Sequence, residues 1–176
     1  MLTEIEVKPK KLVVLDINGL LCYKKLNDSD EKINDEDKYE HVVCDKMILY
    51  LRQGIREFIS KLTEVADIAL WTSGSYYNFS KLAPLFNIKF KFVWYRNMVE
   101  LVKPGEIETV KRVKRILRSP DINWSGCYNE DNVIVVDNDI KKVGMNKNYV
   151  IVDTYNINED DTGKLVIIYN DILEML

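Results

Sequence analysis

Three short runs of mostly apolar residues recur along the chain, and polar residues follow each of them. The runs cover residues 12–15, 67–71 and 133–136. Because consecutive apolar residues cannot alternate between a buried and an exposed face, these runs predict strands that are covered on both sides. The polar residues that come next are Asp16, Thr72, Ser73, Asp137, Asn138 and Asp139.

The placement of these polar residues predicts one common site. Parallel strands of an open sheet bring their carboxyl ends to the same edge, where ligands and catalytic groups gather. Carboxylate and amide oxygens suit a hard cation such as Mg²⁺. Asp, Asn, Ser and Gly are also ordinary turn and capping residues, so each motif alone has a structural explanation. Three motifs in this order favour a shared Mg²⁺ site.

Helical and extended patterns alternate along the rest of the chain. Apolar residues at helical spacing predict helices over residues 55–65, 76–86 and 107–117 and at the C-terminus. Strands are predicted at residues 90–95 and 149–152, and a β-hairpin with a turn at Asp45-Lys46 is predicted in residues 39–52. The remaining segments, 27–38 and 119–131, are predicted loops, of which the first is acidic and mobile.

The alternation and the length of 176 residues predict a single domain over residues 1–176. We expect an α/β fold, a three-layer sandwich around a mostly parallel sheet, with a small β-hairpin insertion after the first strand. The net charge of -3 gives no general attraction to nucleic acid. No apolar run approaches the roughly 20 residues that cross a bilayer, so no membrane partner is expected.

Cysteine and histidine usage narrows the chemistry further. Cys22, Cys44 and Cys127 are scattered and odd in number, which is typical of reduced thiols. Since the N-terminus also lacks a secretory pattern, we expect a cytoplasmic or nuclear protein. His41 is the only histidine and is predicted at an exposed strand edge, which argues against a histidine-based triad.

An aspartate at a strand end can act as a nucleophile toward phosphorus and form an aspartyl-phosphate. Magnesium would neutralise charge on the transferring group. A hydroxyl such as that of Thr72, together with a lysine, would hold the phosphoryl oxygens. The residues therefore favour phosphoryl-transfer chemistry at the sheet edge.

Three segments resemble, in order, signature motifs of the haloacid dehalogenase superfamily. They cover residues 16–20 (Asp-Ile-Asn-Gly-Leu), 71–74 (Trp-Thr-Ser-Gly) and 135–138 (Val-Val-Asp-Asn). Residues 51–58 resemble a segment of one branch, the NLI-interacting-factor-like family, which contains the phosphatases of the RNA polymerase II C-terminal domain. The resemblance covers roughly residues 10–155.

The resemblance implies a role for each matching residue. It makes Asp16 the nucleophile and a Mg²⁺ ligand, and it adds the main-chain carbonyl of Asn18 and the side chain of Asn138 to the metal shell. Thr72 would bind phosphate, and Asp137 would support the metal site. For the phosphate-binding lysine, two candidates stay open, Lys111 and Lys103, of which Lys111 matches the family pattern better.

Asn18 departs from the family's phosphatases, which carry a second aspartate there as general acid and base. An amide cannot exchange a proton near neutral pH, and this help is worth about 10²- to 10⁴-fold. Asp139 and Tyr23 are candidate substitutes. The leading hypothesis is a weakened phosphatase for phosphoserine or phosphothreonine in proteins. The alternative is an inactive module, a pseudophosphatase, that binds a phosphorylated protein or peptide.

A third hypothesis is a nucleic-acid or small-molecule phosphate substrate. It rests on the basic residues of the segment 111–118, which the predicted third helix would present to solvent.

Overall fold

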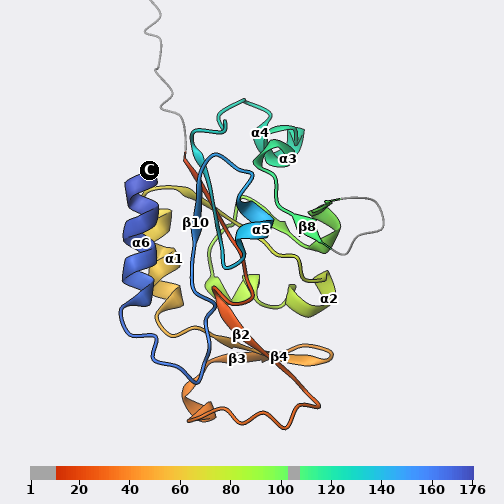
Figure 1. Cartoon of the computed structure of the whole chain (residues 1–176), viewed down its shortest axis with the longest axis vertical. Coiled ribbons are helices and arrows are strands. Elements are labelled where there is room, and N and C mark those ends of the chain that lie inside the picture. The colour runs from red at the N-terminus through yellow and green to blue at the C-terminus, as the bar shows by residue number, and fades with distance from the viewer. Residues whose placement is uncertain (1–10, 103–107) are drawn as a thin grey trace, which may run out of the picture.

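A five-stranded parallel sheet forms the centre of the molecule in the computed structural model, which describes residues 11–102 and 108–176 (Figure 1). Its strands are, in spatial order, β10 (Tyr149–Ile151), β9 (Val133–Asp137), β1 (Leu12–Leu15), β5 (Asp67–Trp71) and β6 (Val93–Trp94). Neighbouring strands are parallel throughout. The three apolar runs form the three middle strands, as predicted.

Helices cover both faces of the sheet, which confirms the three-layer α/β sandwich (Figure 1). On one face lie α1 (Ile55–Thr63) and α6 (Lys164–Met175), in contact with each other. The other face carries α3 (Val113–Leu117), α4 (Pro120–Asn123) and α5 (Ile140–Val143). Along β1, Val13 and Leu15 pack into the first core, and Leu12 and Val14 into the second. Burial on both faces explains why this strand is apolar throughout.

The insertion after β1 is a three-stranded antiparallel sheet. Its strands are β2 (Cys22–Leu26), β3 (His41–Val43) and β4 (Met47–Leu51), with β4 in the middle. The predicted hairpin is β3–β4, and it turns at Asp45-Lys46. Between β2 and β3 the chain is irregular apart from a 3-10 turn, η1 (Glu36–Lys38).

The helix predicted over residues 76–86 is wrong in its length. The chain forms α2 (Tyr76–Phe79) and then a separate 3-10 turn, η2 (Ala83–Phe86). Pro84 lies in the first turn of η2, and its lack of an N–H prevents a continuous helix. The strand predicted at 90–95 is reduced to β6, and η3 (Arg96–Met98) follows it.

The helix predicted over residues 107–117 is confirmed only in its second half. Thr109–Val110 is a strand, β8, paired with β7 (Glu100–Leu101), and the helix α3 begins only at Val113. Ile107 and Lys103 lie outside the described residues. The loop predicted at 119–131 contains α4. Within the described ranges, no helix is both long and apolar enough to cross a membrane.

Candidate active site

The register of the middle strands brings the predicted site residues to one edge of the sheet. Leu15 of β1 pairs with Leu70 of β5 and with Val136 of β9. The next residues along β1 and β9, Asp16 and Asp137, therefore lie level with each other, and Thr72 follows one position beyond β5. At this edge lies a cavity of about 430 Å³, which we call the catalytic cavity.

The catalytic cavity collects most of the residues that the sequence singled out. It is lined by Asp16, Asn18, Thr72, Ser73, Gly74, Asn138 and Asp139, and by residues that the sequence did not indicate, Lys24, Phe79, Arg96, Lys142 and Thr154. Asp137 and Lys111 do not line it; both are buried and lie behind Asp16.

Lys111 lies between the two carboxylates. Its Nζ donates to Oδ1 of Asp16 at 2.7 Å and to Oδ2 of Asp137 at 2.6 Å. Lys111 is 1% exposed, so the expectation that it belongs to a solvated helix face is wrong. Because one ammonium group faces two carboxyl groups, it balances the charge of only one of them when both are ionised, and a bound cation can balance the other.

Burial and pairing compete in setting the pKa values of this trio. For Asp16, loss of solvation is the largest influence and raises the pKa; Lys111 opposes it and Asp137 adds to it, and the net direction is upward. For Lys111, burial acts to lower the pKa, but the attraction of Asp16 and Asp137 overcomes it, and the pKa is raised. Lys111 therefore remains a cation throughout the neutral range.

Asn146 holds the segment that carries Lys111. Its Nδ2 donates to the carbonyl oxygen of Lys111 at 2.7 Å, and its Oδ1 accepts from the N–H of Val113 at 2.8 Å. The N–H of Lys111 donates to the carbonyl oxygen of Lys142 at 2.8 Å. These contacts join the β8–α3 connection to α5. Nothing in the spacing of Asn146 along the sequence indicates this role.

The loop after β1 is shaped by Gly19, whose φ is +83°. Its N–H donates to the carbonyl oxygen of Cys22 at 2.9 Å, which turns the chain back after Asn18. A Cβ on Gly19 would lie 2.6 Å from Nδ2 of Asn138. That Nδ2 donates to Oγ1 of Thr154 at 2.8 Å, and this bond orients the amide of Asn138. Gly19 thus lets two site segments approach closely.

Thr72 is fixed by its own backbone and side chain. Its N–H donates to the carbonyl oxygen of Trp94 at 2.9 Å, and its Oγ1 accepts from the N–H of Gly74 at 3.0 Å. Thr72 is 2% exposed, and its hydroxyl group still has a proton that it can donate. The residue can therefore donate a hydrogen bond to an oxyanion.

The donor set fits a hard cation. Asp16, Asn18 and Asn138 line the same cavity and offer carboxylate, carbonyl and amide oxygens. Asp137 is already engaged, because its Oδ2 accepts from Lys111 and its Oδ1 from the N–H of Asp139 at 2.9 Å. Among the described residues no group of three or more His, Cys, Asp or Glu could hold a metal. A cation here would rely on one carboxylate and keep several waters, as Mg²⁺ does.

The two candidate proton donors occupy different places. Asp139 lines the catalytic cavity, although its Oδ1 also accepts from the N–H of Lys141 at the start of α5. Tyr23 does not line it, and its hydroxyl donates to Glu31. His41 is exposed on β3 and likewise lies outside the lining.

Solved structures share this fold. A variant of Fcp1, the fission yeast RNA polymerase II CTD phosphatase, bound to beryllium fluoride gives a TM-score of 0.61 at 12% identity, over 96% of this chain and 51% of that chain. Another structure of Fcp1, an essential RNA polymerase II CTD phosphatase, gives 0.61 at 13% identity, over 96% and 49%. An uncharacterized protein from Listeria monocytogenes serotype 4b gives 0.53 at 13% identity, over 94% and 98%.

The chain spans about half the length of the Fcp1 chains, and at these identities the likeness establishes a common haloacid dehalogenase-like fold. No curated protein matches the sequence. The family model for NLI interacting factor-like phosphatases matches residues 11–175, which is most of the chain. The resemblance seen in the motifs is thereby confirmed, and the chain belongs to the NLI interacting factor-like phosphatase family.

Proposed function

We propose that the chain is a Mg²⁺-dependent phosphatase-like protein that uses Asp16 as its nucleophile. The observation that supports this most is the pairing of Asp16 with Lys111 at the edge of a cavity that also holds Thr72 and Asn138. A carboxylate held at the mouth of a site by one fixed ammonium group is oriented for attack. The family match supports the same reaction class.

In the proposed reaction, a carboxylate oxygen of Asp16 attacks phosphorus and the bond to the ester oxygen breaks. The hydroxyl of Thr72 donates to a phosphoryl oxygen, and Lys111 holds the nucleophile in place through its hydrogen bond to Oδ1 of Asp16. Bound Mg²⁺, held by Asp16, Asn18 and Asn138, would neutralise charge on the transferring group. Water then hydrolyses the aspartyl-phosphate and regenerates the carboxylate.

The leaving oxygen needs a proton, and Asn18 cannot give one. Its side chain makes no hydrogen bond with the residues that the structure describes, although Asn18 lines the catalytic cavity. We therefore infer that nucleophilic attack is retained and that departure of an alkoxide is slow. Aryl phosphates, whose leaving groups need little protonation, are the substrates on which activity is best detected.

The substrate class that we propose is phosphoserine or phosphothreonine in a protein. Similar structures include an enzyme described as an RNA polymerase II CTD phosphatase, which acts on a protein. The cationic side chains of Lys24, Arg96 and Lys142 line the catalytic cavity and suit an anionic substrate. The segment 111–118 gives little support to a nucleic-acid substrate. Lys111 is buried, and Arg112 is paired with Glu100, with 3.2 Å between its Nε and Oε2 of the glutamate.

The test compares the chain with its Asn18→Asp variant, both with Mg²⁺. On a phosphoserine peptide we expect the variant to be faster by about 10²- to 10⁴-fold, and on para-nitrophenyl phosphate the gain should be much smaller. Asp16→Ala is the control that removes the nucleophile. If the chain and Asn18→Asp both hydrolyse para-nitrophenyl phosphate no faster than Asp16→Ala, the enzymatic proposal fails.

A second candidate function is a pseudophosphatase that binds a phosphorylated protein without turnover. The amide of Asn18 is the observation that favours it. Calorimetry with phosphopeptides separates the two candidates, since binding that persists unchanged for hours without release of phosphate supports the second. If no phosphopeptide binds with or without Mg²⁺, the binding module is excluded.

A further inference from the structure

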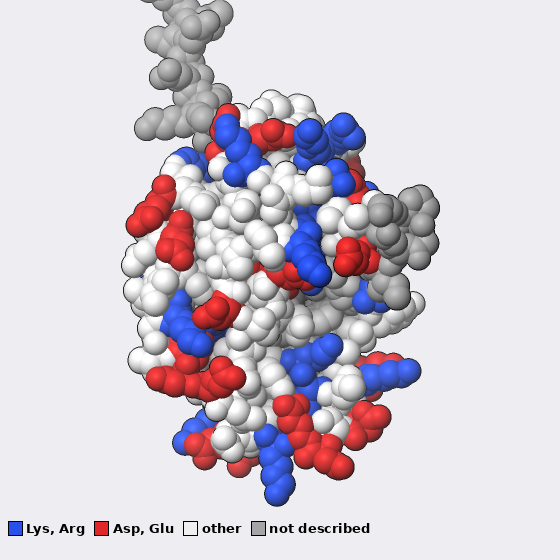
Figure 2. Space-filling model, viewed as in Figure 1, with Lys and Arg blue, Asp and Glu red and all other residues white. Residues whose placement is uncertain are grey.

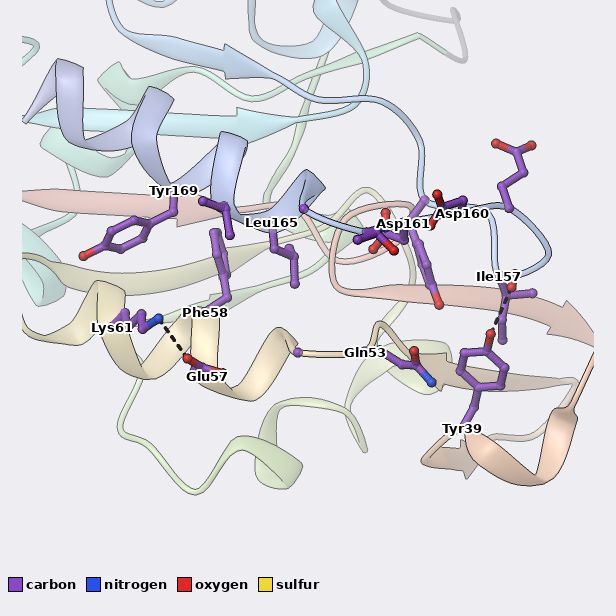
Figure 3. Close-up of a pocket in the computed structure, with 16 residues that line it drawn as sticks. Tyr39, Gln53, Glu57, Phe58, Lys61, Ile157, Asp160, Asp161, Leu165 and Tyr169 are labelled. Atoms are coloured by element: carbon purple, nitrogen blue, oxygen red, sulfur yellow. Dashed lines mark hydrogen bonds and ion pairs between the residues drawn. The ribbon is translucent and has the colours of Figure 1, made fainter.

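A second cavity, of about 540 Å³, lies between α1, α6 and the segment 155–163. We call it the α1–α6 groove. Figure 3 shows that Phe58 from α1 and Leu165 from α6 reach into the space between the two helices, with Tyr39 and Tyr169 toward its ends. Its lining shares no residue with that of the catalytic cavity. Its volume is in the range of ligand-binding pockets.

The α1–α6 groove is acidic. Glu57, Glu159, Asp160 and Asp161 line it against a single cation, Lys61. Glu57 pairs with Lys61 at 2.8 Å, and Asp161 is held by Arg52. Glu159 and Asp160 are exposed and form no ion pair with the residues of the described ranges; one oxygen of Glu159 accepts from Nδ2 of Asn156 at 2.7 Å, and one oxygen of Asp160 accepts from the N–H of Thr162 at 3.0 Å. Acidic side chains also gather on the side of the molecule where α6 lies (Figure 2).

Apolar surface extends from the α1–α6 groove onto the outer face of α6. Val166, which lines the groove, is 62% exposed, and the adjacent Ile167 is 61% exposed. Large aliphatic side chains with this exposure next to an aromatic cavity are typical of surfaces that bind another protein. The complement of such a surface carries both positive charge and apolar side chains.

We propose that the α1–α6 groove binds a basic peptide segment of a partner protein, in which Lys or Arg alternates with apolar residues. The cationic side chains meet Glu159 and Asp160, and the apolar side chains pack against Leu165 and Val166. The charge complementarity and the adjoining apolar face select this occupant over an acidic or purely polar one.

The linings of the α1–α6 groove and the catalytic cavity are adjacent at one point of the chain. Tyr155 lines the groove, whereas its neighbour Thr154 lines the catalytic cavity. The N–H of Tyr155 donates to the carbonyl oxygen of Gly19 at 2.7 Å, which joins this point of the chain to the loop that follows β1. The groove is nevertheless independent of the proposed catalysis, since none of its residues enters that reaction.

The test uses a fluorescent peptide of alternating leucine and arginine as the probe, and the same peptide with glutamate in place of arginine as its control. Anisotropy should show binding of the basic peptide alone. The double variant Glu159→Gln/Asp160→Asn should weaken binding by about five- to tenfold, and Gln53→Lys, on the exposed rim, should also weaken it. Glu174→Gln, an exposed change at the far end of α6, should leave binding unchanged.

Backbone amide NMR of the ¹⁵N-labelled chain locates the bound peptide. Shifts at Gly54, Thr162 and Gly163, with Ser73 and Gly74 unmoved, support the α1–α6 groove. Shifts at the catalytic cavity alone, or equal affinity in all variants, overturn the proposal. A dimer that dissociates on Val166→Lys also overturns it, because the occupant is then a second copy. Hydrolysis of para-nitrophenyl phosphate, measured separately, reports on the proposed function alone.

Discussion

Two carboxylates share the ammonium group of Lys111 in a region closed to solvent. Asp137 and the Lys111 side chain are 0% exposed, and Asp16 is 3% exposed. A charge in such a place is tolerated because it is paired, and removal of the pairing group leaves charge buried without compensation. The trio is therefore a determinant of stability as well as part of the candidate site.

Lys111→Met should lower the free energy of unfolding by about 3–5 kcal/mol, because it leaves Asp16 and Asp137 buried without a cation. Equilibrium unfolding in urea measures the change. Lys114→Met is the matched control, since Lys114 is exposed and lies 3.9 Å from Glu130; its effect should stay within about 0.5 kcal/mol. Equal effects of the two substitutions would contradict the importance of the buried pairing.

Gly19→Ala should both destabilise the chain and impair the site. The positive φ costs about 1–2 kcal/mol for a residue with a Cβ, and the added methyl group meets the amide of Asn138. Gly126→Ala is the control, because Gly126 also has a positive φ (+65°) but has nothing within 4 Å of an added Cβ. We expect the larger loss of stability, and the only loss of phosphopeptide binding, for Gly19→Ala.

The elements of the fold differ in how far the sequence predicts them. Residues 12–15, 67–71 and 133–136 form strands because burial on both faces gives them an uninterrupted apolar pattern. The strands β7 and β8 have two residues each, too few for any periodicity, and β8 lies within the segment whose apolar spacing predicted a helix. Local pattern therefore fails where short elements are fixed by partners elsewhere in the chain.

The residues of the candidate site also differ in how far the sequence predicts their positions. Asp16, Thr72 and Asn138 could be placed because strand register determines where the ends of parallel strands meet. Lys111 could be named but not positioned, since its place depends on hydrogen bonds to Lys142 and Asn146. The contacts of Asn146 span 33 and 35 positions, and no sequence pattern reports them.

Asn146→Ala should loosen the connection between β8 and α3. It removes the partners of the Lys111 carbonyl and the Val113 N–H, at a cost of about 1–3 kcal/mol for each group left unsatisfied. Hydrogen exchange at the Val113 amide should become faster. Asn170→Ala, on the exposed side of α6, is the control and should change neither stability nor exchange at Val113. Unchanged protection of Val113 in Asn146→Ala would contradict this role.

At the scale of the whole molecule, Arg52 connects the end of the insertion to the segment before α6. Its Nε and Nη2 donate to the two oxygens of Asp161 at 2.6 Å each, across 109 positions of sequence, and its Nη1 donates to the carbonyl oxygen of Leu20 at 3.2 Å. The guanidinium also lies 5.1 Å from the ring centroid of Tyr155. The insertion, the loop after β1 and the C-terminal segment are joined at this one side chain.

Replacement of Arg52 and replacement of Asp161 should not lower the free energy of unfolding equally. The side chain of Arg52 is 1% exposed and that of Asp161 is 20% exposed, so Asp161→Asn leaves a buried cation, whereas Arg52→Met leaves a carboxylate that water can reach. We expect about 3–5 kcal/mol of destabilisation for Asp161→Asn and less for Arg52→Met, measured in urea.

The exposed pair Arg56–Glu40 provides the matched control, with side chains that are 45% and 49% exposed. Arg56→Met and Glu40→Gln should each cost no more than about 1 kcal/mol. If Asp161→Asn costs no more than Glu40→Gln, the buried pair does not stabilise the connection.

Asn18 sits in the catalytic cavity with a side chain that no described residue bonds. Its replacement by aspartate therefore disturbs no protein contact, and the codons of the two amino acids differ at a single base. One mutation could therefore convert a receptor that retains phosphorylated partners into an enzyme that dephosphorylates and releases them, or the reverse, within the same fold. Selection at position 18 can then favour either hydrolysis of the phosphorylated partner or its retention.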